Sequence, residues 1–417
     1  MLSRSINVPR LDLSLPSWHF PSFRSRKIPN GFLPLKDLSR SKAPLDGTTW
    51  FMSSINDTFE AGEAEYLRFP SYQSEGRLFC LAGISTRNGT LNSYALIHPE
   101  KLPPGSRFLP GITFVSESHY GYDNICHGLF AMMPFAAWHY RKGCMKPARW
   151  VLYQRGELRK EISNWVTNII ELTFGEKMTV EKFQGAGEVN YKSSCFEEAV
   201  VFRHNEGKML KEKKIQVYEM LRCKSREYCK IQERNGTENL VKMTLLLRNG
   251  SRSFKDEAGV INVFQKECAK VKGCQLKVSQ SENLTFCDQV KLMSETDILA
   301  SPHGAQLTNL FFMDKNSSVM EFFPKGWKDL AGPGQAVFQW ISAYSGMRHV
   351  GTWHDPKGDK CPYNDKSLCM TFYKNRQIGI DENFISNWTS KVLKEEMARK
   401  LHTLKIKRKP ERKCKCS

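Results

Sequence analysis

The 417-residue sequence contains no apolar run long enough to cross a bilayer, and no hydrophobic signal segment occurs in residues 1–45. No Cys-x-x-Cys pair occurs, which argues against zinc-finger and thioredoxin-like sites. Acidic residues are few beside basic ones, with 43 Asp and Glu against 62 Lys and Arg. These absences leave a globular chain that is not a membrane-spanning bundle and has no cysteine-based metal motif.

The net charge of +19 favours either a polyanionic partner or a solvated basic surface. A nucleic-acid-binding protein is therefore one alternative. However, no ribonucleoprotein, zinc or helix-turn-helix signature accompanies the charge, so we expect no nucleic-acid partner. Part of the excess lies in residues 396–417, which we predict to form a disordered basic tail.

Cysteines and glycosylation sequons favour the lumen of the secretory pathway. The sequence has 13 cysteines, an odd number that leaves at least one unpaired, and several are close neighbours. Local disulfides are predicted at Cys223/Cys229, Cys268/Cys274 and Cys361/Cys369. Glycosylation is predicted at Asn56, Asn88, Asn235 and Asn387. Because no signal is visible, we expect a transmembrane anchor upstream of this start.

Strands that alternate with helices predict an α/β protein with parallel sheets. Residues 1–45 are rich in Ser, Pro and basic residues and predict a flexible stem. An N-terminal α/β lobe is expected over 46–235 and a C-terminal α/β lobe over 236–395. The pattern also predicts a helix over 157–172 and another over 306–313.

In the C-terminal half, polar side chains follow successive predicted strands. Arg248 and Arg252 follow one strand, His303-Gly304-Ala305 follows another, and Glu321 ends a third. In open α/β sheets, ligands bind outside the carboxyl ends of the strands. Gly304 allows close approach of the backbone, and a helix after it would point N–H groups at an anion, with Thr308 one turn in. Glu321 could accept hydrogen bonds from a ribose diol, so this edge predicts a nucleoside diphosphate site.

The segment SETDILASPHGAQLTNLFFMDKNSSVMEFFP, residues 294–324, is similar to the signature region of glycosyltransferase family 61. LLLRNGSRSFKDE, residues 245–257, resembles the Arg-x-x-x-Arg segment of the same family. CFEEAVVFRHNEGKM and VYEMLRCKSREYC resemble the plant branch of the family. Because several motifs occur in the family's order, the resemblance extends over most of residues 47–391.

The resemblance implies two Rossmann-like lobes of the GT-B type with a cleft between them. It implies an inverting transfer of xylose, arabinose or N-acetylglucosamine from a UDP-sugar to a glycan or cell-wall polysaccharide. It also implies a Golgi-luminal, type II membrane protein. The residues that would line the donor site are Arg248, Arg252, His303, Gly304, Ala305, Thr308, Asn309 and Glu321.

No cofactor and no metal are expected at the donor site. Glycosyltransferases that hold Mn²⁺ usually use Asp-x-Asp, and the sequence contains no such motif. The charge of the leaving diphosphate would then be met by arginines and a helix N-terminus.

The catalytic base is predicted to be His127 or Asp123. The segment around Asn124 and His127 matches the Asn-x-x-His segment of the family. Many relatives carry an acid one turn after this histidine, whereas residues 128–139 contain none. That departure leaves open a second alternative, a catalytically inactive relative that binds glycans.

Overall fold

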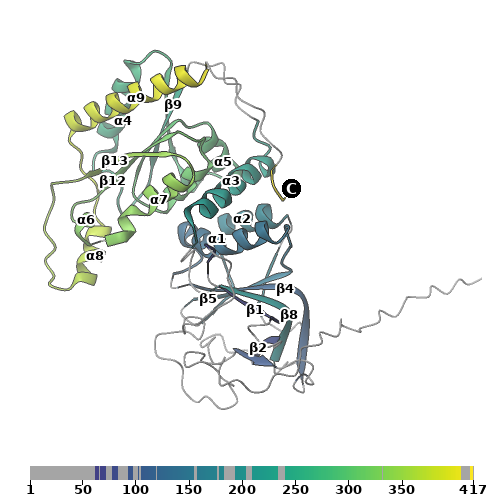
Figure 1. Ribbon diagram of the computed structural model, residues 1–417. Helices are drawn as coiled ribbons and strands as arrows, with labels where there is room; N and C mark the ends of the chain where they lie inside the picture. Colours follow the sequence, from purple (N-terminus) through teal and green to yellow (C-terminus); the bar gives the residue numbers. More distant parts are fainter. Residues whose placement is uncertain are drawn as a thin grey trace, which may run out of the picture.

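The computed structural model shows a mixed α/β protein with two sheets and a layer of helices between them (Figure 1). The structure describes residues 62–64, 66–71, 78–82, 93–96, 102, 105–118, 120–154, 157–175, 178–182, 193–202, 209–232, 240–330, 332–404 and 414–416. The α/β class predicted from the sequence is confirmed. The predicted stem and the predicted boundary near 235 lie outside the described residues.

The elements of the N-terminal half precede residue 230 and build the first sheet. Its strands are β1 (Tyr66–Phe69), β2 (Leu78–Ala82), β3 (Ser93–Leu96), β4 (Ser106–Ser118), β5 (Arg149–Gln154), β6 (Glu157–Arg159), β7 (Thr179–Val180) and β8 (Ser193–Phe202). Its helices are α1 (Ile125–Arg141), α2 (Asn164–Phe174) and α3 (Lys211–Tyr228).

The elements of the C-terminal half build the second sheet. Its strands are β9 (Val241–Leu247), β10 (Cys274–Gln280), β11 (Ile298–Pro302), β12 (Ser318–Phe323) and β13 (Arg348–His354). Its α-helices are α4 (Glu257–Ala269), α5 (Phe286–Ser294), α6 (Trp327–Leu330), α7 (Val337–Tyr344), α8 (Lys366–Lys374) and α9 (Glu382–Leu404). The 3₁₀ segments among the described residues of this half are η3 (Ser281–Asn283), η4 (Ala305–Phe312) and η5 (Gly332–Ala336).

The C-terminal sheet is wholly parallel, with strand order β10-β9-β11-β12-β13. Renumbered from β9, this is the 2-1-3-4-5 order of flavodoxin-like folds, in which the chain changes direction at the first strand. Every residue of β11 and β12 is buried, as expected where helices cover both faces. Helices α4 and α9 cover one face, while α5, η4 and α7 cover the other.

The N-terminal sheet departs from the predicted Rossmann-like lobe because it is mixed. Strand β4 pairs in parallel with β5 and β8, but β1, β2, β3 and β6 pair antiparallel. Among the described helices, α1, α2 and α3 pack on one face of this sheet. The opposite face carries a separate cluster built from strand residues such as Phe79, Val115 and Val201.

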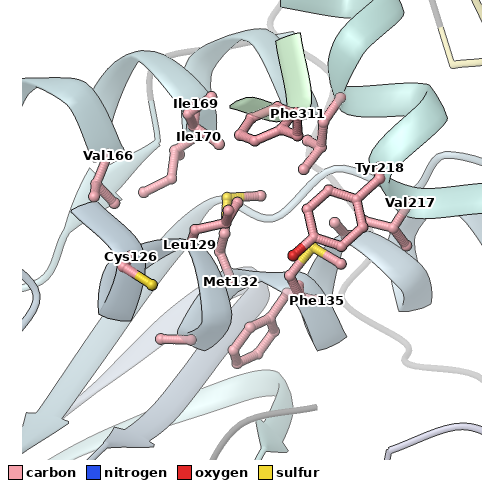
Figure 2. Packing of buried hydrophobic residues seen from close by; sticks show 14 of the residues in the cluster. Cys126, Leu129, Met132, Phe135, Val166, Ile169, Ile170, Val217, Tyr218 and Phe311 are labelled. Carbon is pink, nitrogen blue, oxygen red and sulfur yellow. The ribbon is translucent and has the colours of Figure 1, made fainter. Parts of the chain in front are cut away.

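The two halves share one continuous apolar core. Side chains of α1, α2 and α3 pack directly against η4, α5 and α7, and Figure 2 shows Leu129, Ile170 and Phe311 meeting there. The helices α1 and α2 approach closely at Gly128, where an added Cβ would lie 2.4 Å from Cγ2 of Val166. This shared core, and not the chain connection alone, fixes how the two sheets face each other.

Disulfides reinforce the same junction. Cys268–Cys274 and Cys361–Cys369 confirm two predicted local pairs, and Cys80–Cys195 joins strands β2 and β8. The predicted Cys223–Cys229 pair is wrong, because the bonds are Cys223–Cys414 and Cys229–Cys287. A further bond, Cys144–Cys416, ties the same C-terminal segment to the loop after α1. Among the described cysteines, buried Cys126 is unpaired.

Several local predictions need correction. Residues 157–172 form β6 followed by α2, because Ser163 caps the helix by accepting a hydrogen bond from the Val166 N–H. The segment after Gly304 is a 3₁₀ helix and not an α-helix. The predicted basic tail begins inside α9, and its last cysteines are bonded to the N-terminal half. None of the described helices has the length and apolar character needed to span a bilayer.

Candidate functional site

The candidate site lies at the carboxyl edge of the parallel sheet, at its topological switch point. Strands β9 and β11 are neighbours, but the chain leaves β9 toward β10 on one side and β11 toward β12 on the other. The loops after such a pair diverge and leave room for a ligand. The β9 loop carries Arg248 and Arg252, and the β11 loop carries His303 and Gly304. The topology therefore brings the two predicted donor-binding motifs to the same edge.

The β9 loop holds Arg252 in a left-handed backbone conformation. Its φ is 63°, a region that side chains other than glycine adopt rarely, and Gly250 nearby has φ 68°. Backbone hydrogen bonds fix the loop, from the Arg252 N–H to the Arg376 carbonyl at 2.9 Å and from the Ser253 N–H to the Gly250 carbonyl at 3.1 Å. Residues held in such sparsely populated conformations cluster at functional sites.

The two arginines form a concentrated patch of positive charge. Burial and the neighbouring Arg248 lower the pKa of Arg252 to about 10, so its guanidinium remains charged at neutral pH. Burial also lowers the pKa of Arg248, while Glu282 opposes that shift. The Nε atoms of both arginines are buried and have no hydrogen-bond partner among the described residues. Two desolvated cations with unsatisfied donors favour an anion as the missing partner.

Arg248 is positioned by the β11 loop. Its Nη1 donates to the His303 carbonyl at 3.3 Å and to Oε1 of Gln306 at 3.4 Å. A Cβ at Gly304 would lie 2.1 Å from Nη1 of Arg248, so a larger residue there would displace this guanidinium. The first residue of η4, Ala305, is partly exposed directly beyond it. Gly304 thus permits a close approach to the backbone, as the sequence predicted. The group that approaches is the guanidinium of Arg248 and not a ligand.

Glu321 has a different role from the predicted one. It is fully buried, and both of its oxygens accept hydrogen bonds, from Nδ1 of His303 at 2.6 Å and Nε2 of His349 at 2.8 Å. Burial raises the pKa of Glu321, but the hydrogen bonds and charges of these two histidines outweigh it, and the net shift is downward. A ribose hydroxyl would have to displace an imidazole, so Glu321 supports His303 and does not face a ligand.

Asn309 also differs from its predicted place in the donor site. Its Oδ1 accepts a hydrogen bond from Nε1 of Trp165 at 2.9 Å, and its Nδ2 donates to Oε1 of Gln289 at 2.8 Å. Asn309 therefore joins α2 of the N-terminal half to η4 and α5. Thr308, in contrast, is fully buried and its hydroxyl has no partner among the described residues.

On the N-terminal half, His127 lies in the first turn of α1, which Asn124 caps. Its ring stacks on Tyr120 with centroids 4.4 Å apart. Burial, and the positive charge of Lys374 at the end of α8, lower the pKa of His127. The next residue, Asn375, accepts a hydrogen bond from Ser251, beside Arg252, at 3.1 Å. Lys374, which acts on the charge of His127, thus directly precedes the residue that binds the β9 loop, and Asp123 lies exposed before helix α1.

Residues 127–320 match the family model described as Glycosyltransferase 61. This stretch is a glycosyltransferase family 61 domain. The matched region begins at His127 and includes both arginines and the His303-Gly304 turn. It confirms the family predicted from the motifs and supports glycosyltransferase activity. No curated protein matches the chain.

Sequence reasoning missed two residues near the β9 and β11 loops of the family 61 domain, Trp327 and His349. Trp327 follows β12, its ring centroid is 5.3 Å from that of His303, and Cζ of Arg252 lies 5.4 Å from its centre. Its Nε1 is buried without a partner among the described residues. His349 follows no recognisable motif. Trp327 could have been noticed from the sequence only because it lies shortly after a predicted strand, just beyond the family-like segment 294–324.

The predicted glycosylation sites can be placed only in part. Asn387 is exposed on α9, on the helix that covers the far face of the parallel sheet. Asn56, Asn88 and Asn235 lie outside the described residues. Glycosylation at these positions stays a prediction.

Proposed function

We propose that the family 61 domain is an inverting, metal-independent transferase that uses a UDP-sugar. The sugar is xylose, arabinose or N-acetylglucosamine, and the acceptor is a glycan or a cell-wall polysaccharide. The observation that carries the proposal is the pair Arg248 and Arg252 at the topological switch point, with buried Nε donors that lack a protein partner. The arginine pair suits the diphosphate of a nucleotide sugar, and the family match suggests that the reaction is a sugar transfer.

In the proposed reaction, the acceptor oxygen attacks the anomeric carbon as the bond from that carbon to the diphosphate breaks. The electron pair of the breaking bond leaves with UDP, which gains negative charge. Arg248 and Arg252 meet that charge, and preorganised donors of this kind typically contribute on the order of 10²–10³ in rate. Trp327, whose ring lies beside His303 and Arg252, offers a further unpaired donor.

The acceptor hydroxyl must lose its proton during the attack, and His127 is our first candidate for the base. Its lowered pKa leaves the imidazole neutral and able to accept a proton at neutral pH. Asp123, exposed at the start of the same helix, is the second candidate. The two halves would then divide the work, as in GT-B enzymes, with the acceptor bound on the N-terminal side.

We also propose a Golgi-luminal location for the domain and membrane attachment through an upstream anchor. The disulfides and the glycosylation sequons support an oxidising, glycosylating compartment. No cofactor is proposed, because the arginines take the part that a metal plays in Asp-x-Asp enzymes.

The proposal is tested by a nucleotide-release assay on purified protein. UDP-xylose, UDP-arabinose and UDP-N-acetylglucosamine are each supplied with a panel of glycan and xylan acceptors. Acceptor-dependent release of UDP from one donor is the expected result. Binding of UDP without any turnover would favour the glycan-binding alternative, and absence of UDP binding would contradict the proposed donor.

A further inference from the structure

A buried carboxylate shared by two imidazoles lies directly behind the candidate site. Glu321 of β12 accepts one hydrogen bond from Nδ1 of His303 and a second from Nε2 of His349. The side chains of His303 and His349 are only 8% and 7% exposed, and Glu321 is 0% exposed. An ionised carboxylate in such a dry position is costly unless it is hydrogen-bonded on both oxygens. Both donors are therefore needed to keep Glu321 charged.

A local irregularity of β13 accompanies the contact made by His349. Val319 lies opposite His349, but Glu321 lies opposite Thr352, so β13 has one residue more than β12 in this interval. The extra residue is accommodated at Gly351, whose φ of 112° favours glycine. Such bulges redirect side chains and are frequent beside active sites. A regular strand would not need this glycine. The bulge therefore belongs to β13, the strand that carries His349, and not to β12, which carries Glu321.

His303 is the member of this group that lies beside the arginine pair. Its Nδ1 is bonded to Glu321, which places Nε2 on the opposite edge of the ring. Within the described part of the chain, Nε2 has no hydrogen bond. Phe323, Trp327 and Phe338 surround the ring with centroid distances of 4.7, 5.3 and 5.1 Å. The same residue's carbonyl holds Arg248, so the orientation of His303 and the position of the arginine are linked.

We propose that His349 is a positioning residue for the reaction proposed above. It acts through Glu321 to hold His303 with Nδ1–H on the carboxylate and Nε2 toward the diphosphate of the donor. His349 itself touches no ligand. This inference rests on the proposed nucleotide-sugar site, but it assigns a role to a residue that lies outside the matched family region, 127–320.

The test compares two amides at position 349. His349→Gln keeps an N–H that can reach Oε2 of Glu321, whereas His349→Asn has the same polarity but a side chain too short to do so. UDP and uridine are titrated into each variant by calorimetry. We expect His349→Asn to bind UDP about tenfold more weakly and uridine unchanged, and His349→Gln to stay near wild type, because only the diphosphate meets His303.

A double-mutant cycle provides the control for a purely structural effect. In a His303→Ala background, His349→Asn should cause no further loss of UDP affinity, since its effect passes through His303. Equal losses for UDP and uridine, or independent losses in the cycle, would overturn the inference. Wild-type affinity of His349→Asn for UDP would also overturn it. Wild-type protein that fails to bind UDP would instead contradict the proposed function.

Discussion

Gly304 and Arg248 lie so close that a single methyl group at residue 304 would occupy the place of the guanidinium. The built Cβ falls 2.1 Å from Nη1 of Arg248 and 2.4 Å from Oε1 of Gln306. The backbone at Gly304 is extended, with φ 169° and ψ 171°, so any residue could adopt it. The restriction on residue 304 therefore comes from the neighbouring side chains and not from the local backbone.

This contact predicts the effect of Gly304→Ala. The variant should fold normally, but its methyl group should push Arg248 out of position and weaken UDP binding on the order of 10- to 100-fold. Calorimetric titration of UDP measures the loss. Gly334→Ala is the matched control, because no heavy atom lies within 4 Å of its built Cβ. UDP affinity in Gly304→Ala equal to that of the control would refute the positioning of Arg248.

A second prediction separates structural from ligand-binding residues within the family motif. Asn309→Leu leaves Nε1 of Trp165 and Oε1 of Gln289 without partners, each at a cost of about 1–3 kcal/mol. The free energy of unfolding, measured in urea, should fall by about 2–6 kcal/mol, while the folded protein keeps its UDP affinity. Asn383→Ala, exposed on α9, should change little. A selective loss of UDP affinity in Asn309→Leu would instead return Asn309 to the donor site.

A third prediction concerns pH and the acceptor side. Burial and Lys374 lower the pKa of His127 below 6.5, and a base works only when unprotonated, so kcat/KM should fall only as pH drops below 6.5. Lys374→Ala removes a positive charge, which should raise the pKa of His127 and move the acid limb to higher pH. Lys366→Ala, at the other end of α8, serves as the control. An acid limb that stays in place, or a fully active His127→Gln, would show that His127 is not the base.

The polar residues at the carboxyl edge of the parallel sheet could be predicted from the sequence, because each of them directly follows its own strand. The residues that follow β9 and β11 identify their own edge of the sheet without any contact to a distant segment. Once strands alternate with helices, the carboxyl ends necessarily meet at one edge. The sequence alone therefore groups Arg248, Arg252 and His303.

The remainder depends on contacts between distant segments, which no local pattern encodes. The role of Glu321 depends on His349, which reaches it through a bulge in a neighbouring strand. The role of Asn309 depends on Trp165, 144 residues earlier in the chain. The pairing of Cys223 with Cys414 likewise spans 191 residues, so proximity in sequence pointed to the wrong partner.

The central claim is that Arg248 and Arg252 stabilise the negative charge of the leaving UDP. Release of UDP from the UDP-sugar donor in the presence of EDTA tests it most directly. Wild-type protein should keep its turnover in EDTA, because the arginines and not a metal meet the charge of the leaving UDP. Arg252→Ala should lose turnover on the order of 10²–10³ while its melting temperature stays close to that of wild type, since Arg252 lies in a loop after β9 and holds little of the core. Complete loss of wild-type turnover in EDTA, or full turnover by Arg252→Ala, would contradict the account.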